Sequence, residues 1–226
     1  MHTAGRSAMA LVCAMLPACL GSEVSGTITI QRGVSTKVLA PGVYDLRGMA
    51  AFHGSSAAAK DNAFERVAVW LESDSQAAPA PISATMKQRQ QRLEPALLIV
   101  PVGSTVDFPN LDPIFHNIFS LSRTQSFDLG YYPQSHSRSV KFSRAGIVQV
   151  YCHVHPNMYG AVIVTASPWF GKPAADGAFS WSDVPAGKYR LAVWQKNVGV
   201  VHKDIVVPSV GSIRANVAIP EDDMQN

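Results

Sequence analysis

The sequence predicts an all-β protein in which a Greek-key sandwich is flanked by additional β-sandwich strands. Short apolar or alternating runs recur along the chain, and 16 Gly and 15 Pro separate them. With 47% hydrophobic and 15% charged residues, the composition is too apolar for disorder, and the frequent turn residues exclude helical bundles and coiled coils. A chain of 226 residues has room for one large domain or two small ones.

Residues 1–21 are predicted to be a signal peptide and not part of the fold. Arg6 supplies a positive charge before an apolar run at 8–20 that is too short to span a bilayer. We therefore expect export, a periplasmic location and no membrane span, since no other run of about 18 apolar residues follows. Residues 16–19 also resemble a lipoprotein box, which leaves a lipid anchor at Cys19 open as an alternative.

The N-terminal β segment is predicted at 22–81. Residues 24–30 and 65–72 are rich in β-branched and apolar residues and are expected to form strands. Residues 52–62 are a connection rich in Ser, Ala and Gly, and the Pro- and Ala-rich stretch at 77–81 is the best candidate for a linker. The sequence leaves open whether this segment is an independent domain or adds strands to a neighbouring sandwich.

The middle domain is predicted at 82–166. Its strands are expected at 96–102, 105–108, 114–121, 139–142, 147–152 and 161–165, separated by Gly, Pro, Asn and Asp. Residues 86–93 have helical propensity but only two apolar anchors, seven residues apart, so we expect an extended segment there. Such short, punctuated strands are typical of a sandwich or barrel.

The tail, 167–226, is predicted to be a further β-sandwich. Strands are expected at 178–181, 189–195, 202–207 and 213–219. The motifs at 176–179 and 184–189 resemble those of a carboxypeptidase regulatory-like sandwich, which implies a structural module without catalysis of its own. Residues 66–70 and 189–194 look alike, and the sequence does not separate a weak repeat from chance similarity between two strands.

Cys152 is expected to be the single thiol of the exported chain, because Cys13 and Cys19 lie in the predicted signal peptide. It would then have no partner for a disulfide within the chain, although disulfides are normal in an oxidising compartment. A lone thiol in such a place is buried and inert, reactive, or bound to a metal, and its neighbours decide which.

The neighbours of Cys152 indicate a metal. His153, His155 and Met158 follow it within one short loop between two expected strands. Thiolate and thioether donors together with imidazoles select copper, whereas calcium and magnesium prefer oxygen ligands. The remaining position must come from a distant segment, and His116, a single His in an apolar run, is the natural donor. Two His, one Cys and a weak axial Met form the blue-copper set.

From about 82 to 166 the chain resembles a cupredoxin, a blue copper protein of the plastocyanin and methylamine utilisation protein type. The motifs that carry the resemblance are Gly-Ser-Thr-Val-Asp-Phe-Pro-Asn at 103–110, His116-Asn117 and Cys152-x-x-His155-x-x-Met158. It implies one type 1 copper held by His116, Cys152 and His155, with Met158 as the axial ligand and Asn117 supporting the site near the sulfur. The spacing from Cys152 to Met158 is shorter than in plastocyanin itself, so the resemblance fixes neither the axial bond length nor the redox potential.

The other histidines and the tryptophans are predicted to have structural or surface roles. His153 directly follows Cys152, and because side chains alternate between the faces of a strand, the ligand is assigned to His155. His53, His136 and His202 have no ligand-like neighbours and are expected at the surface. Packing in a core or between domains is expected for Trp70, Trp169, Trp181 and Trp194.

The function that these residues predict is an exported carrier of single electrons, with a redox partner protein whose identity the sequence does not name. A copper carrier or storage protein that delivers the ion to another exported enzyme is one alternative, and an interaction module with a structural metal is another. A net charge of +3 without a run of Lys and Arg argues against a nucleic-acid partner. No motif for hydrolysis, phosphoryl transfer or hydride transfer is present, so we expect no enzyme activity.

Overall fold

The computed structural model describes residues 21–31, 63–74 and 78–220. Residues 1–20 of the predicted signal peptide, which include Cys19, lie outside these residues, and so does His53. The described chain consists of one short 3-10 helix, η1 (Ala63–Arg66), and strands β1 (Ser22–Gln31), β2 (Val67–Glu72), β3 (Ser83–Thr85), β4 (Lys87–Arg89), β5 (Arg92–Glu94), β6 (Leu97–Pro101), β7 (Thr105–Pro109), β8 (His116–Leu121), β9 (Ser126–Tyr132), β10 (Ser137–Lys141), β11 (Gly146–Cys152), β12 (Tyr159–Thr165), β13 (Phe170–Gly171), β14 (Ala178–Val184), β15 (Gly187–Gln195), β16 (Gly199–Val207), β17 (Ser212–Arg214) and β18 (Val217–Pro220). The predicted all-β class is confirmed.

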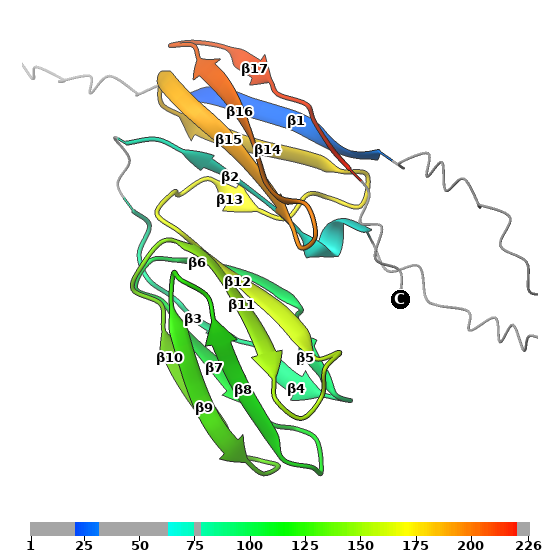
Figure 1. Cartoon of the computed structure of the whole chain (residues 1–226). Coiled ribbons are helices and arrows are strands. Elements are labelled where there is room, and N and C mark those ends of the chain that lie inside the picture. Colours follow the sequence, from blue (N-terminus) through cyan, green and yellow to red (C-terminus); the bar gives the residue numbers. More distant parts are fainter. Residues whose placement is uncertain (1–20, 32–62, 75–77, 221–226) are drawn as a thin grey trace, which may run out of the picture.

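Two sandwiches lie one above the other (Figure 1). The middle sandwich pairs a five-stranded sheet, β6-β12-β11-β8-β9, with a three-stranded sheet, β10-β7-β3, and the hairpin β4-β5 lies at one end of it. Its core contains side chains such as Val106, Phe108 and Val150 from both sheets. The strands alternate in burial, as expected where one face of each strand packs on the core.

The outer sandwich combines strands from both ends of the chain. β1 pairs with β14, β17 and β18, and β2 pairs with β13 and β15, so the N-terminal strands add to the sheets of the tail. Tyr189 donates its hydroxyl to the carbonyl of Pro185 at 3.0 Å and so fixes the turn that precedes β15. The two sheets enclose a core to which Ile28, Leu71 and Leu191 belong.

Strands β2 and β15 are buried on both faces, which explains why their sequences look alike. Val69 and Leu71 point into the outer core, while Ala68 and Trp70 belong to a separate cluster shared with β6 and β12 of the middle sandwich. In the register of these neighbours, Trp70 faces Ala192 of β15. The shared environment of neighbouring strands accounts for the similarity. The cluster that contains Ala68 and Trp70 also joins the two sandwiches through an apolar seam.

Some elements differ from the sequence-based expectation. Residues 86–93 are extended but contain a hairpin, because Gln90 and Gln91 both adopt positive φ and reverse the chain. The expected strand at 213–219 is split into β17 and β18 where the backbone passes close to Gly26; a Cβ there would lie 2.1 Å from the carbonyl oxygen of Ala215. Strand β9 was not predicted, since it is an edge strand with exposed polar residues. Within the described residues, no helix is long and apolar enough to cross a membrane.

Candidate metal centre

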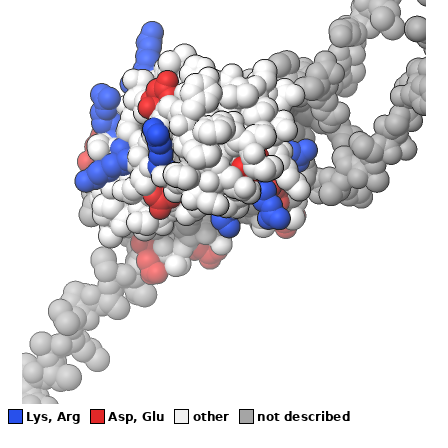
Figure 2. All heavy atoms as spheres, turned by 90° about the horizontal axis from the view of Figure 1, so that it is seen from below, with Lys and Arg blue, Asp and Glu red and all other residues white. Residues whose placement is uncertain are grey.

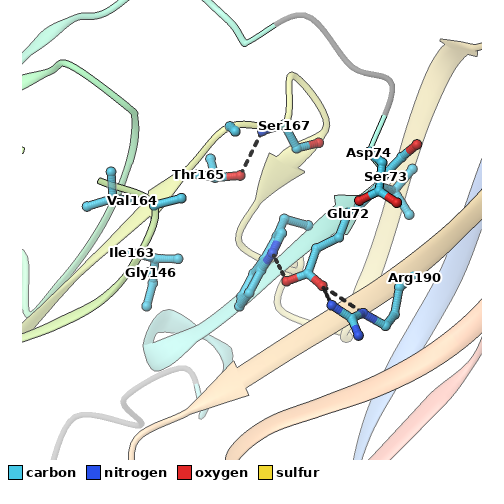
Figure 3. A pocket seen from close by; sticks show the side chains of 13 residues that line it. Glu72, Ser73, Asp74, Gly146, Ile163, Val164, Thr165, Ser167 and Arg190 are labelled. Carbon is cyan, nitrogen blue, oxygen red and sulfur yellow. Dashed lines mark hydrogen bonds and ion pairs between the residues drawn. The ribbon is translucent and has the colours of Figure 1, made fainter. Parts of the chain in front are cut away.

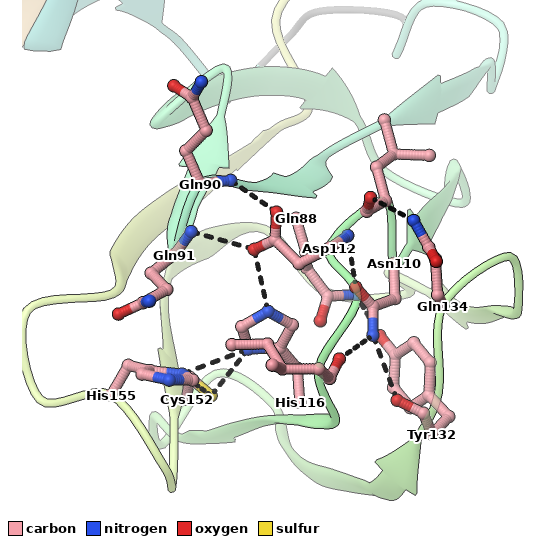
Figure 4. Close-up of polar contacts among 12 residues, drawn as sticks. Gln88, Gln90, Gln91, Asn110, Asp112, His116, Tyr132, Gln134, Cys152 and His155 are labelled. Carbon is pink, nitrogen blue, oxygen red and sulfur yellow. Dashed lines mark hydrogen bonds and ion pairs between the residues drawn. The ribbon is translucent and has the colours of Figure 1, made fainter.

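Three of the predicted ligands meet at one end of the middle sandwich. His116 begins β8, Cys152 ends the adjacent antiparallel strand β11, and His155 lies in the loop that follows (Figure 4). The Sγ atom of Cys152 is 3.6 Å from His116 Nδ1 and 3.8 Å from His155 Nδ1, and the two Nδ1 atoms are 3.2 Å apart. Two strands that pair in the sheet thus bring together residues far apart in the sequence.

The spacing of these three atoms suits a metal ion. A point equidistant from them lies about 2 Å from each, close to the lengths of metal–nitrogen and metal–sulfur bonds in protein zinc sites. His116 is fully buried and Cys152 is 5% exposed, so water does not compete freely for the donors. One thiolate and two imidazoles are donors that copper accepts. The group could therefore hold one copper ion.

The orientation of the His116 ring is fixed from behind by a carboxylate. Its Nε2 lies 3.0 Å from Oδ2 of Asp112, which cannot itself donate when ionised, so we assign the Nε2 proton to this hydrogen bond. The lone pair is then on Nδ1, the nitrogen that faces Cys152 and His155. A metal-ligating His usually donates its second ring N–H in this way, which orients the ring and raises its basicity.

Asp112 is held by the hairpin β4-β5. The backbone N–H groups of Gln90 and Gln91 donate to its two carboxylate oxygens at 2.6 and 2.8 Å (Figure 4). Burial by itself would raise the pKa of Asp112, but these N–H groups and His116 outweigh it, and the pKa is held below its usual value. The φ angles of 52° and 56° at Gln90 and Gln91 are uncommon for residues other than Gly, and here they aim both amides at the carboxylate.

Asn110 fixes the loop that leads into β8. Its side-chain amide donates to the carbonyls of Ile114 and Tyr132, at 2.8 and 3.1 Å, and its Oδ1 accepts the backbone N–H of Asp112 at 2.9 Å. All of these groups belong to the chain just before His116 or to the neighbouring strand β9. The loop therefore presents Asp112 and His116 in one arrangement.

A second buried polar network anchors the hairpin itself. Gln88 is fully buried, and its Nε2 donates to the carbonyl of Phe108 at 2.9 Å and to the hydroxyl of Tyr132. The Tyr132 hydroxyl donates to the same carbonyl at 2.8 Å, and burial raises the pKa of Tyr132 to about 12. The hydroxyl thus stays protonated at neutral pH and keeps its role as a donor.

The loop after Cys152 is tied to β8 and closed on itself. The backbone N–H of His153 donates to the carbonyl of Asn117 at 3.1 Å, and that of Met158 to the carbonyl of His155 at 2.9 Å. Met158 is fully buried in the same core cluster as Cys152. Asn117 is also buried, and its Oδ1 has no hydrogen-bond partner among the residues that the structure describes. The axial role of Met158 and the supporting role of Asn117 stay predictions.

His153 lies outside the group. Its ring stacks on Phe119 with centroids 3.8 Å apart, and its Nε2 is 3.8 Å from Oδ2 of Asp128, on the exposed face of the sheet. This is the placement that strand alternation predicts for the residue after Cys152. His136 and His202 are exposed, and His202 lies near Glu72 of the outer sandwich.

The surface beside the group is apolar. Leu111, Ile114 and Phe115 precede His116 and are exposed, as is Val154, the residue before His155. His155 itself is partly exposed, in contrast to His116. Seen from this end of the molecule, a broad area carries no charged side chain, and Lys, Arg, Asp and Glu lie around it (Figure 2).

A cavity of about 290 Å³ lies elsewhere, at the seam between the sandwiches (Figure 3). Glu72 accepts the indole N–H of Trp70 at 3.0 Å there and forms an ion pair with Arg190 at 2.7 Å. None of the predicted copper ligands lines it. Glu72 and Arg190 thus satisfy each other, and the cavity contributes nothing to the metal group.

Sequence reasoning missed the residues that support His116. Asp112 could have been found, because a carboxylate four residues before a predicted ligand is a candidate partner for its second nitrogen. The contribution of Gln90 and Gln91 could not be predicted, because Gln-Gln is not a sequence that favours a hairpin turn. Their contacts also come from backbone N–H groups, which do not depend on the type of side chain.

A β-sandwich with a His–Cys–His group at one end, buried at His116 and Cys152 and partly exposed at His155, defines the middle sandwich as cupredoxin-like, with a candidate blue copper site. No family model matches the chain, and no curated protein matches it. Solved structures similar to part of it include the Cu-containing nitrite reductase from Thermus scotoductus (22% identity, TM-score 0.36, 42% of this chain and 25% of that chain). Another is a purple cupredoxin from Nitrosopumilus maritimus, with 26% identity and a TM-score of 0.34 over 36% of this chain and 99% of that chain. A third is a reduced amicyanin mutant, with 24% identity and a TM-score of 0.35 over 43% of this chain and 98% of that chain.

This chain thus spans only a quarter of the length of the nitrite reductase chain. Because every one of these TM-scores is below 0.5, we assign the metal group from its own geometry and not from these likenesses.

Proposed function

We propose that the protein is an exported type 1 copper protein that carries single electrons between redox partners. His116, Cys152 and His155 would be the equatorial ligands and Met158 the weak axial one. The observation that carries the proposal is the preformed donor group, with its three atoms 3.2 to 3.8 Å apart and with His116 and Cys152 buried. When bound, copper supplies a one-electron couple, and the chain supplies a fixed set of donors for it.

Rigid support of the donors favours electron transfer. His116 is held by Asp112, whose two oxygens are both occupied by backbone amides, and Cys152 is the last residue of a strand in the middle of a sheet. Donors that do not move keep the structural change between the two oxidation states small. The apolar core next to Cys152 keeps water away.

Burial argues against a copper carrier. A protein that hands its ion to an acceptor must let the acceptor's ligands reach the metal, yet His116 is fully buried and Cys152 is 5% exposed. A purely structural metal is also disfavoured, because both sandwiches have extensive apolar cores of their own. These two alternatives are separated from electron transfer by the experiment below.

His155 is the proposed exit for the electron. It is the one proposed ligand among these four that is partly exposed, and exposed apolar residues lie on both loops beside it. An apolar surface allows a partner to approach closely and exclude water without a large desolvation cost. We propose that a redox partner protein docks on this end of the middle sandwich.

We propose a carrier and not an enzyme. One of the structures similar to part of this chain is a Cu-containing nitrite reductase, so nitrite is the substrate to test. Incubation of the copper-loaded protein with nitrite and an excess of ascorbate, which re-reduces the copper, should consume no more nitrite than ascorbate alone does. Sustained nitrite consumption would overturn this part of the proposal.

We propose a periplasmic location from the predicted leader at 1–21, of which residues 1–20 lie outside the described residues. Fractionation of cells producing the full chain, with mass spectrometry of the mature N-terminus, tests it. Cleavage near Gly21 supports a soluble exported form, and a diacylglycerol adduct at Cys19 supports a lipid anchor. An intact leader in the cytoplasmic fraction contradicts export.

The central test combines a redox titration with a copper-transfer assay. Electron transfer predicts a reversible one-electron couple with one copper retained over repeated cycles. Loss of copper to an apo acceptor protein on each reduction would favour delivery instead. A protein that binds zinc but neither binds nor cycles copper would favour a structural metal.

A further inference from the structure

The hairpin β4-β5 has two unlike faces. Gln88 and Leu93 point into the middle sandwich and are buried, whereas Lys87, Arg89 and Arg92 point outward and are exposed. We call these three residues the basic hairpin face. The inward side has a structural explanation in the network of Gln88 and Tyr132, but the outward side has none in the fold.

The basic hairpin face contains an unfavourable pair. In the register of the hairpin, Arg89 lies directly opposite Arg92, whereas Lys87 lies opposite Glu94. Like charges directly opposite each other on antiparallel strands destabilise the pairing. Neither arginine forms an ion pair with another residue in the part of the chain that the structure describes. The hairpin register thus sets two like charges opposite each other, which disfavours the strand pairing.

The basic hairpin face adjoins the metal group. The turn between its strands supplies the two amides that hold Asp112, and Asp112 in turn holds His116. The backbone N–H of Leu111 also donates to the carbonyl of Gln88 at 2.9 Å. Exposed apolar residues and unpaired positive charges therefore lie next to each other at the same end of the molecule.

We propose that the basic hairpin face docks a cluster of carboxylates on an acidic protein and so orients that protein over His155. This inference rests on the proposed electron-transfer function and adds the chemistry of the partner. The arginines would steer the acidic surface during approach, since charges at the rim of an interface act mainly on encounter and orientation. The apolar residues would then make the close contact. Each carboxylate would also relieve the repulsion between Arg89 and Arg92.

The test is a binding measurement with two matched protein probes. Cytochrome c in its native basic form and after succinylation, which replaces lysine ammonium groups by carboxylates, differ in surface charge but share one redox centre. Each is titrated into the ¹⁵N-labelled full chain loaded with copper, with both proteins kept reduced. Backbone amide shifts then report the affinity and the contact surface without any electron transfer.

A matched variant pair separates this face from net charge. Arg89→Gln with Arg92→Gln removes two charges from the basic hairpin face. Arg123→Gln with Arg144→Gln removes two exposed charges from the turns before β9 and β11. Those turns lie at the ends of β8 and β11 away from His116 and Cys152, a strand length of roughly 20 Å.

We expect the succinylated probe to bind and the native probe to bind at least tenfold more weakly at low salt. The shifts should map to residues 87–94 and to the apolar residues near His155. Arg89→Gln with Arg92→Gln should weaken binding roughly fivefold at low ionic strength, as expected for two exposed ion pairs, and the difference should shrink at 0.3 M salt. The control pair should change the affinity less than twofold.

Several results would overturn the inference. They are equal binding of both probes, an equal loss in the control pair, or shifts that map to the outer sandwich. Tighter binding to vesicles of anionic lipid than to the acidic protein would assign the face to a membrane. Thermal unfolding of the Arg89→Gln, Arg92→Gln variant should be unchanged or raised, which excludes misfolding as the cause. Binding is measured here without electron transfer. A protein that fails to cycle copper reversibly would therefore contradict the proposed function but would not change the measured preference of the basic hairpin face for an acidic protein.

Discussion

His116 and Asp112, four residues apart, form a buried pair in which the ring nitrogen Nε2 lies 3.0 Å from the carboxylate. This contact turns the other nitrogen, Nδ1, toward Cys152 and His155. The carboxylate is fixed in turn by the amides of Gln90 and Gln91. The position of one proposed ligand is thus set by a hairpin more than twenty residues earlier in the chain.

Removing the carboxylate charge at Asp112 should weaken copper binding. An Asn side chain has one oxygen and one NH₂ group, so at least one of the three donors that face Asp112 would meet another donor. We expect Asp112→Asn to lower copper affinity by roughly 10- to 100-fold, as is typical when the partner of a ligand is lost. Competition with a Cu(I) chelator measures it. Asp107→Asn on β7 is the control and should bind as the unaltered protein does.

The thiolate of Cys152 should give the oxidised protein its colour. A thiolate bound to Cu(II) in such a site produces an intense sulfur-to-copper charge-transfer band, which reduction should abolish. Cys152→Ser should fold, as judged by circular dichroism, but lack the band. A colourless wild-type protein with stoichiometric zinc after growth in excess copper would argue strongly against a blue copper site.

The two neighbouring histidines should behave differently. His155→Gly should abolish the band or leave an open position that added imidazole fills, because His155 Nδ1 is one of the three donor atoms. His153→Gly should keep the spectrum and lose only the stacking on Phe119. The measurement is the intensity of the charge-transfer band while imidazole is added to each variant. An equal loss of the band in the two variants would refute the assignment of His155 as the ligand.

Met158 should tune the site and not create it. The axial thioether is a weak, long ligand, so Met158→Leu should keep copper and colour. The reduction potential should rise, because losing an axial electron donor destabilises the more highly charged Cu(II) state more than the Cu(I) state. Voltammetry of the variant beside the wild type measures the shift. Complete loss of copper would show that Met158 is an essential ligand or a packing residue.

Asn117 should support the loop that carries the ligands. Its carbonyl accepts the N–H of His153, and its side chain is buried beside that contact. Asn117→Ala should retain all four proposed ligands but lower copper affinity by roughly 10-fold or more. The rate of copper loss to a chelator is the measurement. An unchanged rate would restrict the role of Asn117 to its backbone.

The sequence by itself determined the strand-rich class and the set of candidate donors. Alternating and continuous apolar runs report burial on one or both faces of a strand, and that signal is local. Cys152, His155 and Met158 are close in sequence, so their spacing could be recognised directly. His116 could be added because few other histidines lie in an apolar run.

Only the tertiary structure decided what surrounds these donors. Asp112 receives its amides from Gln90 and Gln91, and β1 and β2 pair with strands of the tail and not with the middle sandwich. Backbone hydrogen bonds between distant segments depend on the path of the chain, and a backbone amide is the same group in every residue except proline. The basic hairpin face was also decided by the tertiary structure. Arg89 lies opposite Arg92 because the chain turns at Gln90 and Gln91, and turn propensities do not predict a turn at Gln-Gln.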